Sequence, residues 1–348
     1  MSGRTLVVVT GADGFAGRAV CAHLRRRGVE VRGLVRGLEG EARAREDIVA
    51  TGDLAASDEQ ALAGAIRGAR AVVHLAGRAH VARETAPDPG HAYQLANCVG
   101  TQRLARAAAG AGVAQFIFAS TVKVNGEATV PGHPFIEGDA ADPHDAYARS
   151  KWAAEQALRK IARDTDLEVT VLRLPLMYGP GVKGNFAKLV DAVARGVWLP
   201  LGAVANRRSL LSVHNFASAI EALLAPDPSA LRHRVPFAGA PLAEGTLLES
   251  NPSALRYRAA TYFVADAEVP STPALIRAVA NALQVSARLV AVPLPLLRLA
   301  GACINQSAAI ARLTNSLEVD TAAFRGATGW RPPFTLEGGL RGVTSNAG

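Results

Sequence analysis

Short apolar runs rich in β-branched residues alternate with Ala/Leu/Arg segments through the first half of the chain. The runs predict strands buried on both faces, because they lack alternating polar positions. The segments between them repeat apolar residues at helical spacing, which predicts helices packed on a sheet. The expected strands are Leu6–Thr10, Glu30–Val35, Ala71–Leu75, Gln115–Ala119 and Val169–Leu174. The expected helices are Gly14–Arg27, Asp58–Ile66, Tyr93–Gly110 and Tyr147–Asp164.

Strand–helix alternation of this kind predicts an α/β fold with a doubly wound parallel sheet. From about Leu176 onward, glycine and proline interrupt the pattern and the helices return in pieces. We therefore expect a first domain over residues 1–175 and, interdigitated with it, a smaller C-terminal ligand-covering lobe over residues 176–348. Residues 222–258 contain a near-repeat, which we interpret as a slipped duplication inserted at the surface.

Composition is typical of a globular chain and argues against one class of partner. Hydrophobic residues make up 49% and charged residues 20% of the 348 positions. The net charge of +8 comes from Arg scattered along the chain, and only five residues are Lys. Because no basic run is interleaved with aromatic residues, we do not expect nucleic acid as a partner.

Cysteine usage and apolar stretches indicate the compartment. Cys21, Cys98 and Cys303 show neither a disulfide framework nor metal-ligand spacing, so we expect a cytoplasmic protein without a metal. The stretch Leu289–Ala311 is interrupted by Arg298 and two prolines, and it falls short of the ~20 residues that a transmembrane helix needs. We interpret it as a buried or partner-covered helix, with contact at a membrane surface as the second interpretation.

A glycine-rich turn directly follows the first predicted strand. It reads GADGFAG over residues 11–17 and opens the first predicted helix. Glycine permits a tight turn and a close approach of the backbone to a pyrophosphate, and the amides at a helix N-terminus attract an anion. The turn therefore predicts a Rossmann-type fold with a bound dinucleotide. The expected contacts are Gly11, Gly14, Phe15, Ala16 and Gly17.

Tyr147 and Lys151 form a YxxxK motif at the start of a predicted helix. The spacing of four residues places both side chains on one helix face. A nearby lysine lowers the pKa of a phenol and can also hold a nicotinamide ribose. The tyrosine then exchanges a proton with a sugar hydroxyl or ketone while hydride moves to or from the nicotinamide. We expect both residues to be catalytic and to contact the cofactor.

The GxxGxxG spacing and the YxxxK motif together resemble the extended short-chain dehydrogenase/reductase superfamily. The resemblance implies that Thr121 holds the substrate oxygen, because it ends the strand FIFAST 26 residues before Tyr147. An intact set of Thr121, Tyr147 and Lys151 favours a working enzyme over a non-catalytic Rossmann protein, which is the alternative. Further cofactor contacts implied by the resemblance are Asp53 and Leu54 of TGDL, Leu75, Ala76 and Gly77 of HLAG, and Asn97 in the next helix.

The end of the second strand bears on the identity of the cofactor. Dinucleotide-binding folds that take NAD place an acidic residue roughly 20 residues after the glycine turn. This chain has Arg36 there, with Arg32 close by. Both would attract a 2′-phosphate, so NADP(H) is favoured. NAD(H) stays open, because a solvated Arg36 explains the sequence equally well and Glu39 is near enough to reach a ribose.

Lys123 stands two residues after Thr121, on the same side of an extended segment. We expect it to bind substrate or to shift the pKa of Tyr147, the alternative being a solvated lysine at a strand end. The same segment excludes one reaction. Sugar-nucleotide 4,6-dehydratases carry an Asp-Glu pair after the Thr, and Val122 and Lys123 occupy those places here.

Residues 173–181, RLPLMYGPG, resemble the RxPxxYGPG segment of nucleotide-sugar enzymes in this superfamily. Leu176 replaces an Asn that contacts the nucleotide-sugar in many relatives, so Asn185 and Phe186 become the next candidates. Arg208 takes the place of an Arg that binds the diphosphate of a UDP-sugar, and a guanidinium suits a diphosphate through paired hydrogen bonds. The alternative for this arginine is a basic surface turn.

Together these segments resemble the nucleotide-sugar epimerase/reductase branch of bacterial lipopolysaccharide and O-antigen synthesis. The leading interpretation is reduction of the C4 ketone of a UDP-2-acetamido-2,6-dideoxy-4-hexulose, with Tyr147 protonating the oxygen. The alternative is a UDP-glucose or UDP-N-acetylglucosamine 4-epimerase that retains NAD+. Either implies a UDP-linked sugar as partner. The resemblance also implies a homodimer joined through the helices Tyr93–Gly110 and Tyr147–Asp164.

Overall fold

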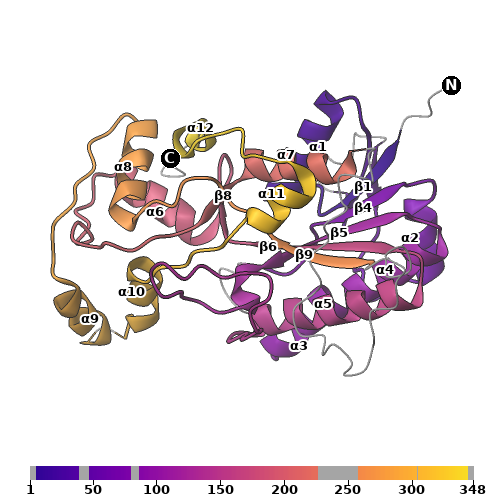
Figure 1. The fold of residues 1–348 in the computed structure, drawn as a ribbon, viewed down its shortest axis with the longest axis horizontal. Helices are drawn as coiled ribbons and strands as arrows, with labels where there is room; N and C mark the ends of the chain where they lie inside the picture. The colour runs from indigo at the N-terminus through magenta and orange to yellow at the C-terminus, as the bar shows by residue number, and fades with distance from the viewer. Residues whose placement is uncertain (1–4, 39–46, 80–85, 226–257, 304, 344–348) are drawn as a thin grey trace, which may run out of the picture.

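A computed structural model describes residues 5–38, 47–79, 86–225, 258–303 and 305–343, so nearly all of the near-repeat lies outside the described residues. Seven parallel strands form one sheet in the order β3-β2-β1-β4-β5-β6-β9 (Figure 1). The strands are β1 (Leu6–Thr10), β2 (Glu30–Val35), β3 (Ile48–Ala50), β4 (Ala71–His74), β5 (Gln115–Thr121), β6 (Glu168–Leu174) and β9 (Ala259–Phe263).

The strand order reverses between β1 and β4. Val7 pairs with Val31 of β2 on one side and with Ala71 of β4 on the other. The chain therefore leaves β1 and β4 in opposite directions, which opens a crevice beyond their carboxyl ends. Ligands of open α/β sheets bind at such a position, and the glycine turn at residues 11–17 lies there.

Helices cover both faces of the sheet, which confirms the predicted α/β Rossmann-type fold. One face carries α1 (Phe15–Arg26), α7 (Val213–Leu224) and α11 (Ala322–Thr328), while the other carries α2 (Glu59–Ile66), α4 (Gly100–Gly110) and α5 (Ala146–Asp164). Figure 1 shows the two layers above and below the strands. Burying both faces explains why the strands read as continuous apolar runs.

The remaining elements form a smaller lobe with its own apolar core. Its two parallel strands pair Leu176 with Leu210, and its core includes Phe186, Ile276 and Leu297. Its elements are β7 (Leu176–Tyr178), β8 (Leu210–Ser212), α6 (Gly184–Ala194), α8 (Thr272–Ala282), α9 (Leu294–Cys303), α10 (Ser307–Thr314) and α12 (Leu336–Leu340). Among the described helices, none is both long and apolar enough to cross a membrane.

Two features differ from the sequence prediction. The helix expected at Tyr93–Gly110 is divided into α3 (Pro89–Tyr93), a π-helical turn η2 (Gln94–Val99) and α4. Strands β3 and β9 were not predicted. Strand β3 has only three residues and lies at the sheet edge, so its apolar pattern is too short to recognise. Strand β9 follows the near-repeat, beyond the part of the sequence in which strands and helices alternate regularly.

Candidate functional site

The glycine turn is packed so tightly that side chains do not fit at two of its positions. Gly11 has φ +63°, and a Cβ there would lie 3.0 Å from the backbone of Ala76. A Cβ on Gly17 would lie 2.0 Å from the carbonyl oxygen of Gly11. Gly14 caps α1 without a side-chain hydrogen bond, so the helix presents backbone amides to the crevice. These are the features of a pyrophosphate cradle.

The predicted adenosine-side residues lie together at the ends of β2 and β3. The amide of Gly52 donates to the carbonyl of Arg36 at 3.1 Å, and Asp53 follows directly. Both Arg36 and Asp53 are exposed. Arg32 points elsewhere, because its Nη1 donates to the carbonyls of residues 65 and 67 at 2.9 and 3.1 Å. Glu39 lies outside the described residues.

His74 organises the loop that faces the glycine turn. Thr10 Oγ1 accepts from the amides of residues 75 and 76, so its own proton goes to His74 Nδ1 at 2.7 Å. His74 Nε2 then donates to Thr101 Oγ1 at 2.8 Å, and that hydroxyl donates to the carbonyl of Asn97 at 2.7 Å. Burial, followed by the charge of Lys151, lowers the pKa of His74 to about 3. The imidazole is therefore neutral and fixed in one tautomer.

Protonation of His74 is expected to weaken the fold in acid. Between the ordinary pKa of 6.5 and about 3, the unfolded chain binds a proton that the folded chain refuses. The contribution of this site is complete above pH 6.5 and falls with pH by at most about 1.4 kcal/mol per unit. A His74→Gln variant lacks this proton. In urea unfolding at pH 7, 6, 5 and 4, its deficit relative to wild type should shrink; a constant deficit would contradict the assignment.

Asn97 joins the same loop to the helix that carries Tyr147. Its Oδ1 accepts from the amide of Arg78 at 2.7 Å, and its Nδ2 donates to the carbonyl of Arg78 and to Ser150 Oγ, both at 3.0 Å. A Cβ on Gly77 would lie 2.9 Å from Asn97 Oδ1 and 3.3 Å from Lys151 Nζ, so any larger residue there would push against the Asn97 amide. The buried amide, held inside the π-helical turn, explains why the predicted helix is interrupted.

Thr121 and Tyr147 meet at the carboxyl end of β5. Thr121 ends the strand, Tyr147 is the second residue of α5, and the two side chains share a hydrogen bond. Lys151 lies one turn further along, where its Nζ donates to the carbonyl of Ala119 at 2.8 Å and lies 4.5 Å from the centre of the Phe118 ring. The three predicted catalytic residues are therefore brought to one place beside the crevice.

The ionisation of this group differs from the expectation of a lowered phenol pKa. Burial, and then the negative charge of Asp145, raise the pKa of Tyr147 to about 12, against the opposing bond from Thr121. Burial lowers the pKa of Lys151 to about 8, although the charge of Glu155 opposes it. At neutral pH the phenol is thus protonated and the ammonium is still largely charged.

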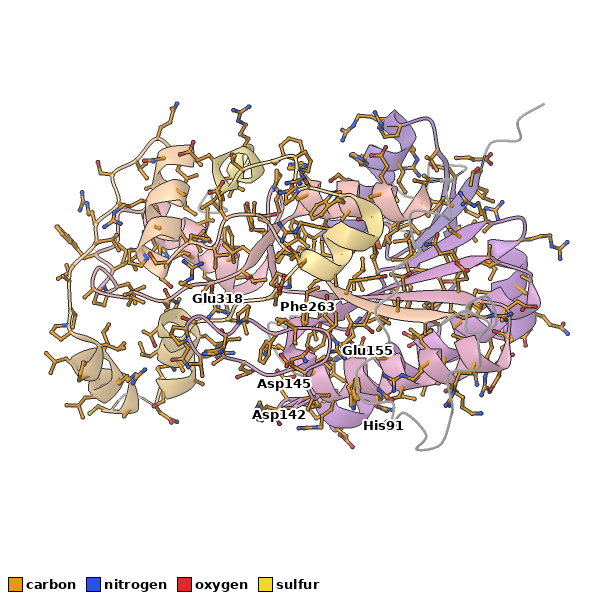
Figure 2. The ribbon with its side chains drawn as sticks, in the orientation of Figure 1. His91, Asp142, Asp145, Glu155, Phe263 and Glu318 are labelled. Carbon is orange, nitrogen blue, oxygen red and sulfur yellow. The ribbon has the colours of Figure 1, made fainter. Side chains whose placement is uncertain are left out.

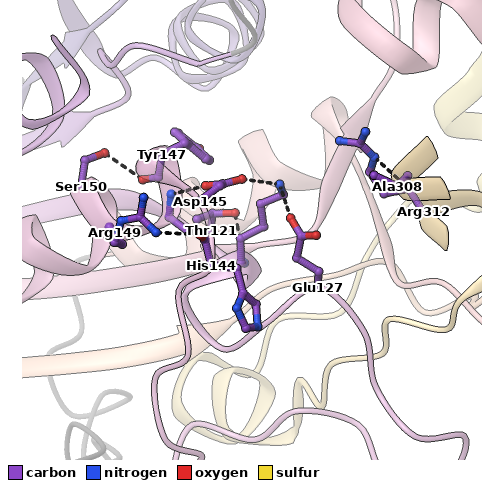
Figure 3. A network of polar contacts seen from close by, with 11 residues as sticks. Thr121, Glu127, His144, Asp145, Tyr147, Arg149, Ser150, Ala308 and Arg312 are labelled. Atoms are coloured by element: carbon purple, nitrogen blue, oxygen red, sulfur yellow. Dashed lines mark hydrogen bonds and ion pairs between the residues drawn. The ribbon is translucent and has the colours of Figure 1, made fainter. Parts of the chain in front are cut away.

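Lys123 lies beside this group in two ion pairs (Figure 3). Its Nζ is 2.7 Å from Asp145 Oδ2 and 2.8 Å from Glu127 Oε1. Asp145 in turn caps α5, because its Oδ1 accepts from the amide of Ala148 at 2.6 Å. Burial opposes the charge of Lys123, but these two carboxylates outweigh it and raise the pKa of the lysine. The structure therefore places Lys123 in an ion pair with the residue that caps α5.

An Asp145→Asn variant should separate the charge of this side chain from its cap. Asn caps a helix as well as Asp, so the unfolding free energy should change by less than about 0.5 kcal/mol, whereas Asp145→Ala should cost about 1 kcal/mol. Loss of the charge lowers the pKa of Tyr147, so the phenol-controlled limb of kcat/KM against pH should move down by about half a unit. An unmoved limb in Asp145→Asn would show that the carboxylate does not act on the phenol.

The predicted substrate residues are split between the catalytic side and the lobe. Asn185 is exposed at the start of α6, whereas Phe186 is buried and stacks on Tyr178 with ring centres 5.7 Å apart. Arg208 Nη1 donates to the carbonyls of Arg312 and Asn315 at 2.8 and 3.1 Å. The guanidinium thus fastens β8 to the end of α10. Across the described residues, no three His, Cys, Asp or Glu side chains are grouped to hold a metal ion.

A buried ion pair beneath Lys151 was not foreseen from the sequence. Arg173 Nη2 lies 2.7 Å from Glu155 Oε2, and both side chains are at most 1% exposed. Ser120 Oγ donates to the same carboxylate, and Arg173 Nη1 donates to Asn125 Oδ1 at 2.9 Å. Figure 2 labels Glu155 on α5, on the side of the helix that faces the sheet. The signal was present: an arginine interrupts the apolar strand VTVLRL, and a glutamate stands four residues after Lys151.

Comparisons with known proteins agree with this architecture. Residues 7–233 match the NAD dependent epimerase/dehydratase family. A UDP-glucose 4-epimerase of Vibrio cholerae is 32% identical over 338 residues, which cover 96% of this chain and 93% of the relative. A UDP-2-acetamido-2,6-beta-L-arabino-hexul-4-ose reductase of Pseudomonas aeruginosa is 28% identical over 55% of this chain and 41% of its own. The UDP-glucose 4-epimerase structure of Thermotoga maritima, with UDP-glucose, has TM-score 0.71 at 20% identity over 97% of both chains, which supports the fold.

Proposed function

Because the chain belongs to the NAD dependent epimerase/dehydratase family, we propose that it is a 4-epimerase of UDP-linked hexoses. The observation that carries the proposal is the meeting of Thr121, Tyr147 and Lys151 beside the crevice at the strand-order reversal. Its support from comparison is the epimerase of Vibrio cholerae, which is similar along nearly its whole length. From the sequence alone, the reductase was the favoured interpretation and the epimerase was the alternative, so the preference between the two functions is now reversed.

The residues of the crevice fit a nicotinamide dinucleotide. The glycine turn provides a cradle that a Cβ on Gly17 would fill, and the side-chain-free surface of Gly77 faces Lys151. When bound, the nicotinamide supplies reversible hydride chemistry at C4 of the sugar. The pyrophosphate would rest on the start of α1, and Lys151 would bond the nicotinamide ribose.

The protein's own part in the reaction is to hold and move one proton. Thr121 fixes the O4 atom of the sugar by a hydrogen bond, and Tyr147, after losing its own proton to form the phenolate, accepts the O4 proton at Oη as C4 is oxidised. The same phenol returns that proton after the sugar has presented its other face. Lys151 favours, through its charge, the phenolate form of Tyr147 that has to be present before the O4 proton is accepted, and its ammonium lies against the ring of Phe118.

A second function, reduction of a UDP-4-keto-hexose, is favoured by two observations. Arg36 is exposed at the end of β2, where a 2′-phosphate of NADPH would lie. The raised pKa of Tyr147, about 12, keeps the phenol protonated and ready to donate to a ketone oxygen. The relative from Pseudomonas aeruginosa carries the name of such a reductase.

The nucleotide that copurifies with the protein distinguishes these functions. Freshly purified protein is denatured, and the released nucleotide is identified by mass spectrometry. The molar ratio of nucleotide to protein is then measured. Stoichiometric NAD+, with interconversion of UDP-glucose and UDP-galactose, would support the epimerase. Exchangeable NADP(H), without interconversion, would overturn it in favour of the reductase. A Gly17→Val variant is the control, because its side chain would fill the cradle and release the nucleotide.

We infer a homodimer that acts in the cytoplasm on sugars for a surface polysaccharide, in keeping with the resemblance to the O-antigen branch. Helices α4 and α5 lie side by side on one face of the sheet and would form a four-helix bundle with a second copy. Light scattering tests the assembly: a mass of about twice 36.2 kDa is expected, and 36.2 kDa would reject it.

A further inference from the structure

Helix α9 presents apolar side chains to solvent at the far end of the lobe (Figure 1). Leu296 and Leu299 are 56% and 62% exposed. Its inner face packs on α10, where a Cβ on Gly301 would lie 2.6 Å from Ile310 Cγ1. Arg298 is the one charged residue in the sequence of α9. Surface helices are ordinarily polar on the outward face, so this helix departs from the rule.

Further exposed apolar residues lie in the chain segment that leads into the helix and in the segment paired with it. Residues 199 and 288–290 pair as short extended segments, with Leu199 N donating to the carbonyl of Arg288 at 2.8 Å and Val290 N to that of Leu199 at 3.0 Å. This brings together Trp198, which is 64% exposed, and Val290, which is 41% exposed. The Arg288 guanidinium lies 5.7 Å from the centre of the Trp198 ring. We call these residues the α9 patch: Trp198, Arg288, Val290, Leu296, Arg298 and Leu299.

The charged residues of the chain segment that carries α9 have a single sign. Between Glu268 and Glu318 the sequence holds four arginines and neither Asp, Glu nor Lys. By contrast, α5 carries Glu, Lys, Arg and Asp along its length. A surface that combines leucine, tryptophan and arginine is complementary to a bilayer interface with anionic headgroups. It suits nucleic acid less, because the exposed leucines would stay in water.

We propose that the α9 patch docks the protein on the surface of a membrane containing anionic phospholipid. Leu296, Leu299 and Trp198 enter the headgroup region, while Arg288 and Arg298 lie against phosphates. The helix has ten residues and lies on the bilayer without spanning it. Figure 1 shows α9 at the far end of the smaller lobe, away from β1 and α1, so docking leaves the cofactor crevice open.

Cosedimentation with vesicles tests the proposal without any sugar substrate. Full-length protein should bind vesicles of three parts phosphatidylcholine to one part phosphatidylglycerol at least ten times more strongly than vesicles of phosphatidylcholine alone. Binding should weaken as salt rises. The double variant Leu296→Asp/Leu299→Asp should lose at least ten-fold. The matched control is Val130→Asp/Ile136→Asp, which adds the same charge at apolar positions that are 67% and 48% exposed outside the patch.

Cys303 provides an independent readout on the same helix. It is exposed, whereas Cys21 and Cys98 are buried, so a polarity-sensitive thiol dye attaches there selectively. Anionic vesicles should shift the dye emission to the blue in wild type and not in the Leu296→Asp/Leu299→Asp variant. Absence of vesicle binding, equal binding to neutral vesicles, or binding unchanged by the double variant would each overturn the proposal. So would a dimer that the double variant converts to monomer. Neither the cosedimentation assay nor the dye assay depends on epimerase activity, so failure of the proposed function would leave both tests of membrane docking unaffected.

Discussion

Turnover falls by about a thousand-fold when Tyr147 is replaced by Phe, because the substrate oxygen then has no partner that takes and returns its proton. The ring is retained, so its edge contact with Tyr93, at 6.1 Å between centres, is preserved. The nucleotide content should also be preserved, since the glycine cradle is untouched. The measurement is kcat with a UDP-hexose at saturating concentration, together with the nucleotide released on denaturation.

Tyr93→Phe is the matched control for this change. It removes a phenolic hydroxyl from the neighbouring ring without touching the Thr121 contact, and kcat should stay within two-fold. If Tyr147→Phe also stayed within ten-fold of wild type, the proton would be moved by another group and the assignment of Tyr147 would be wrong. If the variant lost its nucleotide, the tyrosine would act in binding instead.

The second large effect is on stability, and it comes from the buried pair of Arg173 and Glu155. Replacing Arg173 by Met leaves a buried carboxylate without its partner and should cost about 3–5 kcal/mol of unfolding free energy. The double replacement Arg173→Met/Glu155→Leu removes both charges and should recover most of that loss. Urea unfolding at pH 7 gives the unfolding free energy of the single and the double variant from the midpoint and the slope of each transition.

The same variants report on catalysis through Lys151. Glu155 opposes the lowering of the lysine's pKa, so loss of its charge should lower that pKa further below about 8. The lysine-controlled limb of the rate profile then moves to lower pH in the double variant even where the fold is intact. A double variant as unstable as Arg173→Met would show that shape, and not charge, is what the pair contributes.

Local patterns were sufficient to predict most of the sheet and the proximity of Tyr147 and Lys151. The strand Leu6–Thr10 and the glycine turn that follows it are adjacent in sequence, so their relation needs no long-range information. Tyr147 and Lys151 share one helix for the same reason. The pairing of Thr121 with Tyr147 followed from resemblance, and the structure places the two side chains in contact.

Other features depend on partners far away in the chain. The division of the helix at 94–99 follows from Asn97 bonding Ser150, 53 residues later. The role of Lys123 follows from Asp145 and Glu127, which only the folded loop brings to it. Arg208 is predicted to bind a diphosphate, and its Nη1 also bonds carbonyls more than 100 residues away. Contacts between residues so far apart in the chain leave no periodic pattern in the local sequence, so they could not be predicted from it.

Strand β9 stands far after its neighbour β6 in the sequence, and this separation affects folding during synthesis. This strand is the outer neighbour of β6, pairing Val169 with Ala259 and Arg173 with Phe263. During synthesis β6 therefore leaves the ribosome well before its partner, with a row of unpaired backbone groups on an apolar edge. Such an edge invites association between nascent chains. A shortened gene that ends near residue 175 should yield aggregates, and a separable cofactor-binding fragment has to carry residues 259–263 grafted beside β6.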